Sequence, residues 1–471
     1  MKTQKLLKGA LLAASTVLLA GCAVGPDYKK PAPTPTASPA DFKEIQGWKA
    51  ADPAPPAQRG AWWSIYNDAT LNQLESQVAL NNQNIATAAA NYRAAKTLIT
   101  QAQAGLFPNL GASFAASRSQ SPGLNGRSAA GNNFSPSLDA NWTVDLWGAI
   151  RRQTAEARQN AEVSKDDLAY AALSAQATLA ADYMQLRSAD ALAALLQETV
   201  TADARALTIT RNQYASGIVT RADVLSAQTT VDSARAQLAA VASSRAIYEH
   251  AIAVLMGQAP AALSVGATVL ATQVPVVPAG VPSALLERRP DIAAAEHTMH
   301  AKNEAVGVAV AALYPTITLT ASGGFTGNAL NNLFNVANRI WSLGGTSALT
   351  IFDAGAQTAA VHEARANYDA AVATYRQTVL SAFQGVEDQL ATLHALQNES
   401  ALDDATVAAA RQAMSVYLNQ YRAGTVAYTS VITAQNALLS AQQAQLSTQT
   451  NRLLASVSLV ENLGGGWEEV K

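Results

Sequence analysis

Apolar residues recur at spacings of three and four over long stretches of the chain, which is the period of an α-helix that packs along one face. The packing face of residues 149–213 is formed by Leu168, Ala172, Ala175, Leu179, Tyr183 and Leu186. Alanine at several of these positions lets neighbouring helices approach closely, as in a coiled coil. The pattern predicts one helix over residues 149–213, roughly 98 Å long at about 1.5 Å per residue.

The same arrangement occurs twice along the chain. The long helix breaks at residues 213–217 and is followed by a shorter helix, and a second break of the same kind lies at residues 420–424. The shift that carries Gly217 onto Gly424 also carries Pro108 onto Pro315 and Gly148 onto Gly355. A register kept over so many positions predicts two tandem structural repeats, residues 67–257 and 290–464.

Further helices fill both repeats. In the first repeat we expect helices over residues 67–104, with an Asx cap at Asn67-Asp68, and over residues 220–257. In the second repeat we expect them over residues 290–312, 356–420 and 427–463. Residues 258–289 are interpreted as an equatorial linker between the repeats and residues 465–471 as a C-terminal tail.

Each repeat also contains two segments in which apolar and polar residues alternate with the period of a β-strand. They cover residues 109–119 and 137–147 in the first repeat, with a loop rich in Gly, Ser and Asn at 120–134. In the second repeat they cover residues 316–322 and 341–352. We therefore expect one β-hairpin in each repeat, at residues 109–147 and 316–352, and four strands in the chain.

Four strands with one apolar and one polar face cannot close a barrel by themselves, and an open sheet edge is not tolerated in hydrocarbon. A trimer would supply twelve strands, with apolar side chains toward lipid and Ser, Thr, Asn and Asp toward a wet lumen. Taken alone, the strands also fit a soluble sandwich or an interaction hairpin. The prediction is an α+β membrane protein with a trimeric 12-stranded transmembrane β-barrel, four strands from each protomer.

The N-terminus has the pattern of a targeting segment. Lys2, Lys5 and Lys8 precede a short apolar run that ends in Leu19-Ala20-Gly21-Cys22, and the run is too short to span a bilayer. It resembles a bacterial lipoprotein signal peptide, which implies removal of residues 1–21 and a covalent lipid, with palmitate, on Cys22. Ala23 in the next position points, by the same resemblance, to the outer membrane. The alternative is an ordinary secretory signal in which Cys22 is incidental.

Residues 22–66 are interpreted as a Pro-rich N-terminal arm. We expect it to be extended from Cys22 to about Arg59, because repeated proline fixes the backbone in extended conformations.

Composition narrows the classes of function. A formal net charge of −2 without a basic stripe argues against nucleic-acid binding. Cys22 is the only cysteine, so the chain has no disulfide framework and no thiolate metal cluster. His297 and His300, beside Glu296, are three residues apart and could share a helical face, but the group matches no metal or enzyme motif. We interpret these side chains as solvated or packed and expect no enzyme activity, no metal and no cofactor besides the lipid.

Several longer motifs identify a family. They are Cys22-Ala23-Val24-Gly25-Pro26-Asp27-Tyr28, Trp62-Trp63, Leu285-Leu286-Glu287-Arg288-Arg289-Pro290-Asp291-Ile292 with Ala294-Ala295-Glu296, and Leu313-Tyr314-Pro315. With these motifs the chain resembles the TolC-like outer-membrane efflux proteins, in particular the lipoprotein branch that serves resistance-nodulation-division pumps. The resemblance covers nearly the whole mature chain.

The resemblance implies a homotrimeric duct in the outer membrane of a Gram-negative bacterium, whose β-barrel continues into a long periplasmic α-helical barrel. Such a duct passively conducts drugs or other small toxic compounds, and so contributes to multidrug resistance. Its implied partners are outer-membrane lipid, a periplasmic membrane-fusion adaptor and an inner-membrane transporter. The alternatives are a type I protein-secretion duct and a periplasmic coiled-coil structural lipoprotein without a pore.

The two breaks lie at the far periplasmic end of the expected helices. Gly217 and Gly424 suit the positive φ of such turns, and they can be turns and nothing more. By the resemblance, Tyr214, Gly217, Tyr421, Arg422 and Gly424 are candidates for tip packing and adaptor contact.

The stretch after the second break contains Thr429 and Thr433 but no carboxylate, so an acidic gate is not expected. We expect instead that Arg422, Arg221 and Asp223 pair across helices, with Tyr421 filling the constriction. Exposed pairs of this kind contribute about 0–1 kcal/mol each, so such a gate would open easily.

Overall fold

The computed structural model describes residues 23–33, 42–43, 61–122, 128–270, 273–275 and 289–465. Cys22, the signal peptide at residues 1–21 and most of the predicted tail lie outside the described residues. The chain divides into two compact units. The strand unit comprises Met1–Ala32, Ala90–Lys165 and Ala294–Arg376, and the helical unit comprises Pro33–Ala89, Asp166–Ala293 and Gln377–Lys471.

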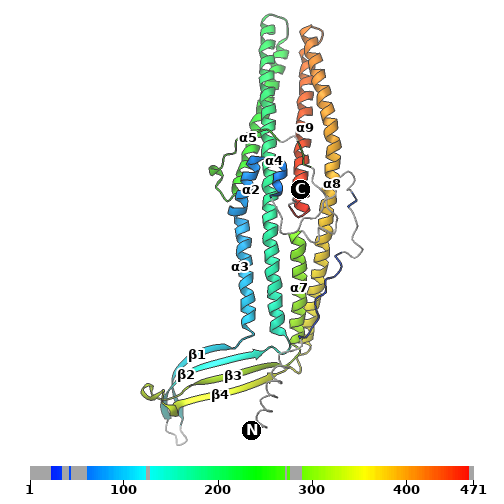
Figure 1. Ribbon diagram of the computed structural model, residues 1–471. Coiled ribbons are helices and arrows are strands. Elements are labelled where there is room, and N and C mark those ends of the chain that lie inside the picture. The colour runs from blue at the N-terminus through cyan, green and yellow to red at the C-terminus, as the bar shows by residue number, and fades with distance from the viewer. Residues whose placement is uncertain are drawn as a thin grey trace. The chain divides into compact units, whose positions relative to one another are not determined.

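Two helical hairpins run side by side in the helical unit, although the first turns of their long helices belong to the strand unit (Figure 1). The first joins α4 (Ala149–Ala215) to α5 (Arg221–Leu255), and the second joins α8 (Ala356–Arg422) to α9 (Tyr428–Asn462). Corresponding helices in the two hairpins begin and end at positions related by the shift that relates Gly217 to Gly424. Both long helices end two residues later than expected, because the chain reverses only at these glycines, where φ is 71° and 74°.

The helix expected over residues 67–104 is broken into α2 (Ala69–Asn81) and α3 (Gln83–Ala104). Asp68 caps α2, as expected, by accepting hydrogen bonds from the backbone N–H groups of Thr70 and Leu71. Asn82 causes the break, since its Oδ1 caps α3 at 2.9 Å from the Asn84 nitrogen and its Nδ2 donates to the Leu255 carbonyl. A side chain that replaces helical hydrogen bonds in this way competes with the helix itself.

The arm is not extended throughout its length. Trp62–Tyr66 forms the 3-10 helix η2, in which Trp62 and Tyr66 are buried. Tyr66 shares a hydrogen bond of 2.8 Å with Ser456 of α9. The last five residues of the predicted arm are therefore held by their aromatic rings in the core of the helical unit.

That core lies where the hairpins, α2 and η2 meet, and it contains three of the predicted face residues, Leu179, Tyr183 and Leu186.

The motif around Arg289 begins the shorter helix α7 (Pro290–Ala311). Arg289 forms hydrogen bonds with the Asp291 carboxylate. It also donates to the backbone carbonyl of Asn462, the last residue of α9, at 2.9 Å. A cation there satisfies an unpaired carbonyl at the end of α9. Three further 3-10 helices are η3 (Pro260–Ala262), η4 (Leu330–Asn332) and η5 (Val336–Asn338).

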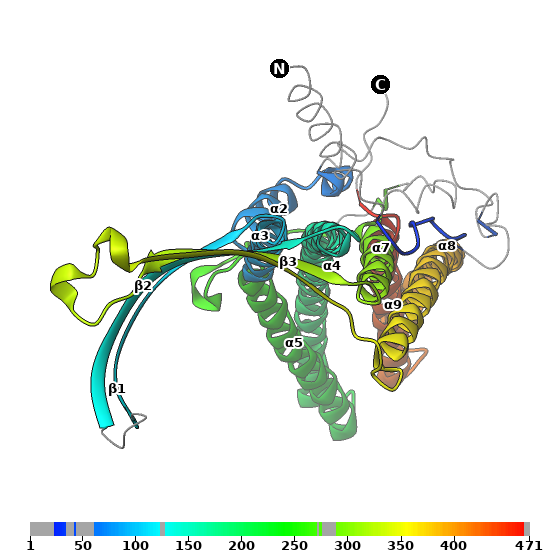
Figure 2. The ribbon, with the colours of Figure 1, turned by 90° about the horizontal axis from the view of Figure 1, so that it is seen from below.

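The strand unit contains one curved antiparallel sheet in the order β1-β2-β3-β4 (Figure 2). Its strands are β1 (Asn109–Pro122), β2 (Ser128–Val144), β3 (Thr316–Phe325) and β4 (Arg339–Ala348). The loop predicted over residues 120–134 was wrong, because backbone pairing continues to Pro122 opposite Ser128. The hydrophobic alternation fades in this polar stretch, although ladder hydrogen bonds do not depend on it.

The predicted hairpins also extend too far at their C-terminal ends, residues 147 and 352. The strands end at Val144 and Ala348 because an aspartate follows each of them and caps the next helix. Asp145 accepts from the Ile150 nitrogen at 3.0 Å, and Asp353 accepts from the Gln357 nitrogen at 2.8 Å.

Candidate functional site

The strand register places apolar side chains on one face of the sheet. Paired residues share a face, and the pairs Ala112 with Leu138, Trp142 with Leu319 and Ala321 with Leu343 join all four strands. Their face also carries Leu110, Phe114, Phe134, Val144, Ile317 and Trp341. Leu110, Phe114, Trp341 and Leu343 are all exposed in the single chain. An apolar face of this size is typical of contact with lipid or another protein.

The opposite face is polar. It carries Ser113, Ser135, Ser137, Asp139, Asn141, Thr143, Thr316, Thr318, Thr320, Ser322, Ser342 and Thr346. Hydroxyl pairs bridge neighbouring strands, with Ser113 Oγ at 2.8 Å from Ser137 Oγ and Ser322 Oγ at 2.9 Å from Ser342 Oγ. The predicted alternation is therefore confirmed across the sheet, and one of its faces suits water.

The turns at the helix ends are built differently from the predicted ion pairs. Thr220 and Asp223 form a capping box at the start of α5, in which Asp223 Oδ2 accepts from the Thr220 nitrogen at 2.9 Å and from its hydroxyl at 2.7 Å. In the described part of the chain, neither Arg221 nor Arg422 forms an ion pair with Asp223. Within one chain the carboxylate serves as part of the N-cap, and the pairing of Arg422, Arg221 and Asp223 across helices in the assembly stays a prediction.

Tyr421 lies between the two hairpins. Its hydroxyl donates to Gln213 Oε1 of α4, and its ring lies 5.2 Å from that of Tyr428 at an interplanar angle of 51°. Both rings belong to a hydrophobic cluster with Leu207 and Val431, which also takes residues from α5. Within one chain, Tyr421 therefore joins the hairpins instead of standing free to fill a constriction.

The other predicted tip residues do not come together in a single cluster. Tyr214, Gly217, Arg221, Arg422, Gly424, Thr429 and Thr433 are all exposed near the ends of the hairpins. Thr433 donates its hydroxyl to the Thr429 carbonyl at 3.0 Å, which satisfies the side chain locally. Their roles in gating and adaptor contact stay predictions.

Sequence reasoning missed a buried carboxylate below the tips. Asp203 of α4 is buried, and its Oδ1 accepts a hydrogen bond from Gln435 Nε2 of α9. Burial raises its pKa to about 6. The signal was present, because Asp203 falls on the same helical stripe as the buried residues Leu196, Leu207 and Thr210.

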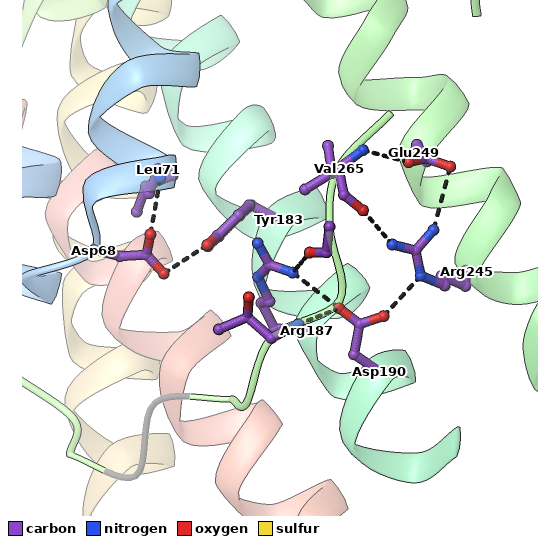
Figure 3. A network of polar contacts seen from close by, with 10 residues as sticks. Asp68, Leu71, Tyr183, Arg187, Asp190, Arg245, Glu249 and Val265 are labelled. Carbon is purple, nitrogen blue, oxygen red and sulfur yellow. Dashed lines mark hydrogen bonds and ion pairs between the residues drawn. The ribbon is translucent and has the colours of Figure 1, made fainter. Parts of the chain in front are cut away.

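A second missed cluster centres on Asp190 of α4 (Figure 3). Asp190 accepts from Arg187 at 2.9 Å and from Arg245 of α5 at 2.7 Å. Arg187 donates to the Gly266 carbonyl at 2.6 Å, and Arg245 donates to the Val265 carbonyl. Glu249 completes the network by accepting from the Val265 nitrogen at 2.6 Å. The network fastens the start of the predicted linker to both helices of the first hairpin.

The N-terminal segment at residues 23–33 packs against helices of the strand unit. The Val24 nitrogen donates to the Trp147 carbonyl at 3.0 Å. Arg152 of α4 returns a bond to the Val24 carbonyl at 2.8 Å and pairs with buried Glu304 at 2.9 Å. A Cβ built on Gly307 would lie only 2.0 Å from Arg152 Cδ, so glycine is needed for this approach. Residue 23 therefore lies beside the junction of β2 and α4.

We expect Arg152→Ala to release this segment, because the substitution leaves Glu304 buried without its guanidinium partner and frees the Val24 carbonyl. Trypsin should then cleave after Lys29 at least about tenfold faster, since proteolysis follows the population of the open form. Arg151→Ala is the matched control, because Arg151 pairs with Asp145 at the more exposed side of α4. Equal cleavage rates in the two variants would contradict this role of Arg152.

The histidines of α7 have ordinary partners. His297 Nδ1 lies 2.9 Å from Gln159 Oε1, and the His300 ring stacks on Tyr28 with centroids 4.1 Å apart. Burial lowers the pKa of His300 even though Glu304 lies 3.5 Å away. Among the described residues, no group of three or more His, Cys, Asp or Glu side chains is arranged to hold a metal ion.

A family model described as outer membrane efflux protein matches residues 74–258 and 281–465, once for each of the two repeated segments. The chain belongs to the outer membrane efflux protein family. The TolC-like assignment made from the motifs is thus confirmed.

This efflux protein is similar along nearly its whole length to known relatives. The probable efflux pump outer membrane protein TtgC of Pseudomonas putida is 30% identical over 463 residues, which cover 97% of this chain and 95% of that protein. Outer membrane protein OprJ of Pseudomonas aeruginosa is 30% identical over 475 residues, covering 98% and 96%. The solved outer-membrane channel OprN matches with a TM-score of 0.86 and 30% identity, covering 95% of this chain and 100% of that chain.

The efflux protein is therefore an outer-membrane channel of a Gram-negative bacterium and serves as the exit duct of an efflux pump. Members of its family are transport channels. The predicted efflux function and outer-membrane localisation are confirmed, and the alternative of a structural lipoprotein without a pore was wrong.

Proposed function

We propose that the efflux protein works as a homotrimer, in which three four-stranded sheets close a 12-stranded β-barrel and two tandem repeats from each chain form a periplasmic helical barrel. The observation that carries this proposal is the two-faced sheet. Among the described residues, one edge of β1 and one edge of β4 have no pairing strand, and the apolar face of the sheet is exposed in one chain. Closure with neighbouring copies satisfies the edges, turns the apolar face to lipid and turns the polar face to a wet lumen.

The trimeric duct conducts passively. An inner-membrane resistance-nodulation-division transporter supplies the energy, and a periplasmic membrane-fusion adaptor docks at the exposed tips near Gly217 and Gly424. The cargo consists of drugs or other small toxic compounds. The membership of the efflux family and the name of TtgC as an efflux pump protein support this role.

Cys22 carries the covalent lipid in the mature protein. The placement of residue 23 beside the junction of β2 and α4 supports this assignment, because strand ends in a barrel lie near the membrane surface. A lipid on the preceding residue could then reach the bilayer without unwinding the chain. Mass spectrometry of the mature N-terminus should find acylated Cys22, and an unmodified residue there would contradict the assignment.

The channel itself is tested by the oligomeric mass of the purified mature protein in detergent, together with its conductance in planar bilayers. We expect a trimer that gives small or intermittent currents, since resting tips constrict the duct. A monomer without conductance under all conditions would overturn the proposed assembly. A trimer that rescues secretion of a protein substrate but not resistance to drugs would instead favour a type I secretion duct.

A further inference from the structure

The two hairpins of one chain contact each other near their tips. Residues equivalent to those of this contact also lie on the outer sides of the hairpins, where they are exposed. Within the chain, α9 contacts α5 and is joined to α4 by the hydrogen bond from Gln435 to Asp203. Near the tips, Tyr421 of α8 donates a hydrogen bond to Gln213 of α4. The shift that relates the repeats carries Gln213 onto Gln420 and Tyr421 onto Tyr214. The sequence therefore contains a second tyrosine–glutamine pair, Tyr214 and Gln420, in which the tyrosine lies on α4 and the glutamine on α8.

The exposure of the equivalent positions differs in a regular way. Thr210 of α4 is 0% exposed, whereas its equivalent Tyr417 of α8 is 40% exposed. Ile432 of α9 packs into the cluster around Tyr428, whereas its equivalent Leu225 of α5 is 57% exposed. At these two positions, a site that is covered on α4 or α9 is thus uncovered at the equivalent place on α8 or α5.

The helix α5 shows the same deficit over its length. Within the described residues it is the one helix long and apolar enough to cross a membrane by length and composition, yet only 17% of its most apolar stretch is buried. Its counterpart α9 has twelve buried residues, including Val431, Ala434 and Leu453. Although α5 contacts α9, its outer side with Leu225, Ile247 and Val254 stays exposed. An exposed apolar helix face calls for a further neighbour.

We propose that this neighbour is a second copy of the chain, and that Tyr214 of one copy donates its hydroxyl to Gln420 of the next while α8 packs on α5. This arrangement follows from the two repeats, because a closed ring of similar hairpins places the same kind of contact between every two neighbouring hairpins. Tyr214 is 48% exposed and Gln420 is exposed in one chain, so both are free for this contact. The proposal rests on the proposed trimer and names its contact surface at the tips.

The intersubunit contact differs from the one within the chain in its polar content. Asp203 and Gln435 form a buried pair between α4 and α9. The equivalent positions are Ala410 and Gln228, and Gln228 instead accepts from Arg211 of its own hairpin at 2.6 Å. The contact between copies therefore depends on the Tyr214–Gln420 pair and on apolar packing around Leu225 and Tyr417.

The contact is tested by cysteine cross-linking between two differently tagged copies of the protein that are expressed together, each carrying one introduced cysteine. Tyr214→Cys on one copy and Gln420→Cys on the other should be joined by a short bis-maleimide into a covalent dimer, which single-variant samples should lack. The matched control combines Gln213→Cys with Tyr421→Cys, whose contact lies within one chain, and the dimer should be lost there. A second pair, Tyr417→Cys with Leu225→Cys, guards against local disruption of the turn.

The outcomes separate this inference from the proposed function. A conducting trimer in which neither the Tyr214–Gln420 pair nor the Tyr417–Leu225 pair yields covalent dimers would overturn the proposed contact and leave the trimeric duct intact. Equal dimer yields from the Gln213–Tyr421 control would also overturn it, because the contact would then not follow the repeat. A monomer without conductance would refute both.

Discussion

Asp190→Ala is expected to lower the free energy of unfolding of the helical unit by about 3–5 kcal/mol, the cost of removing one partner from a buried ion pair. The substitution leaves the Arg187 guanidinium, whose side chain is 3% exposed, without its carboxylate. It also removes one of the two carboxylate partners of Arg245 and the acceptor for the Thr268 nitrogen. Thermal unfolding followed by the helical circular dichroism signal measures the loss.

The same variant should loosen the start of the linker. Hydrogen exchange at residues 265–268 should accelerate, because this segment is fastened by Arg187, Arg245 and Asp190. Asp232→Ala is the matched control on α5, since it breaks an exposed pair with Arg235 that contributes at most about 1 kcal/mol. If the two variants unfold at the same temperature, the network around Asp190 does not stabilise the protein as inferred.

Glu75→Gln is expected to stabilise the efflux protein at neutral and alkaline pH but not at pH 4. Glu75 of α2 is fully buried, and neither of its carboxylate oxygens has a hydrogen-bond partner in the described residues. Burial therefore raises its pKa to about 9 from an ordinary value of 4.5. The side chain is a neutral acid at pH 7, and glutamine reproduces its shape without an ionisable proton.

The sign follows from proton binding. Between pH 4.5 and pH 9 the folded protein keeps the Glu75 proton that the unfolded chain has lost, so its stability falls as pH rises. The loss amounts to about 1.4 kcal/mol for each pH unit in that window. Unfolding midpoints of the two proteins should coincide at pH 4 and diverge toward pH 8, with the glutamine variant higher. Glu198→Gln, at an exposed position of α4, should show no such divergence, and parallel pH profiles for wild type and Glu75→Gln would contradict the prediction.

Local sequence patterns predicted the elements well where short-range physics decides them. Asp68 caps α2 because its side chain reaches N–H groups two and three residues ahead. Gly217 and Gly424 reverse the chain because each adopts a positive φ that other residues avoid. The two-faced sheet was also visible, since alternation of side chains is a property of each strand.

The candidate site was predicted less completely, because its contacts join residues far apart in the chain. Tyr421 was expected to fill the constriction, and within one chain Gln213 and Tyr428 hold it between the hairpins. Asp223 was expected to meet an arginine, but within one chain its carboxylate accepts from the Thr220 nitrogen and hydroxyl at the start of α5. Asp203 was overlooked, because an aspartate on an apolar stripe shows its partner only when α4 and α9 are brought together.

The sequence by itself determined the repeat, the long helices, the hairpins and the family, since periodicity, turn residues and motifs are local features that one chain displays in order. Only the tertiary structure decided that Asn82 divides a helix, that Asp190 gathers two arginines and that the N-terminal segment is held by Arg152. These features depend on which buried polar groups find partners across distant segments. A linear pattern shows which groups need partners, and only packing shows which partners they find.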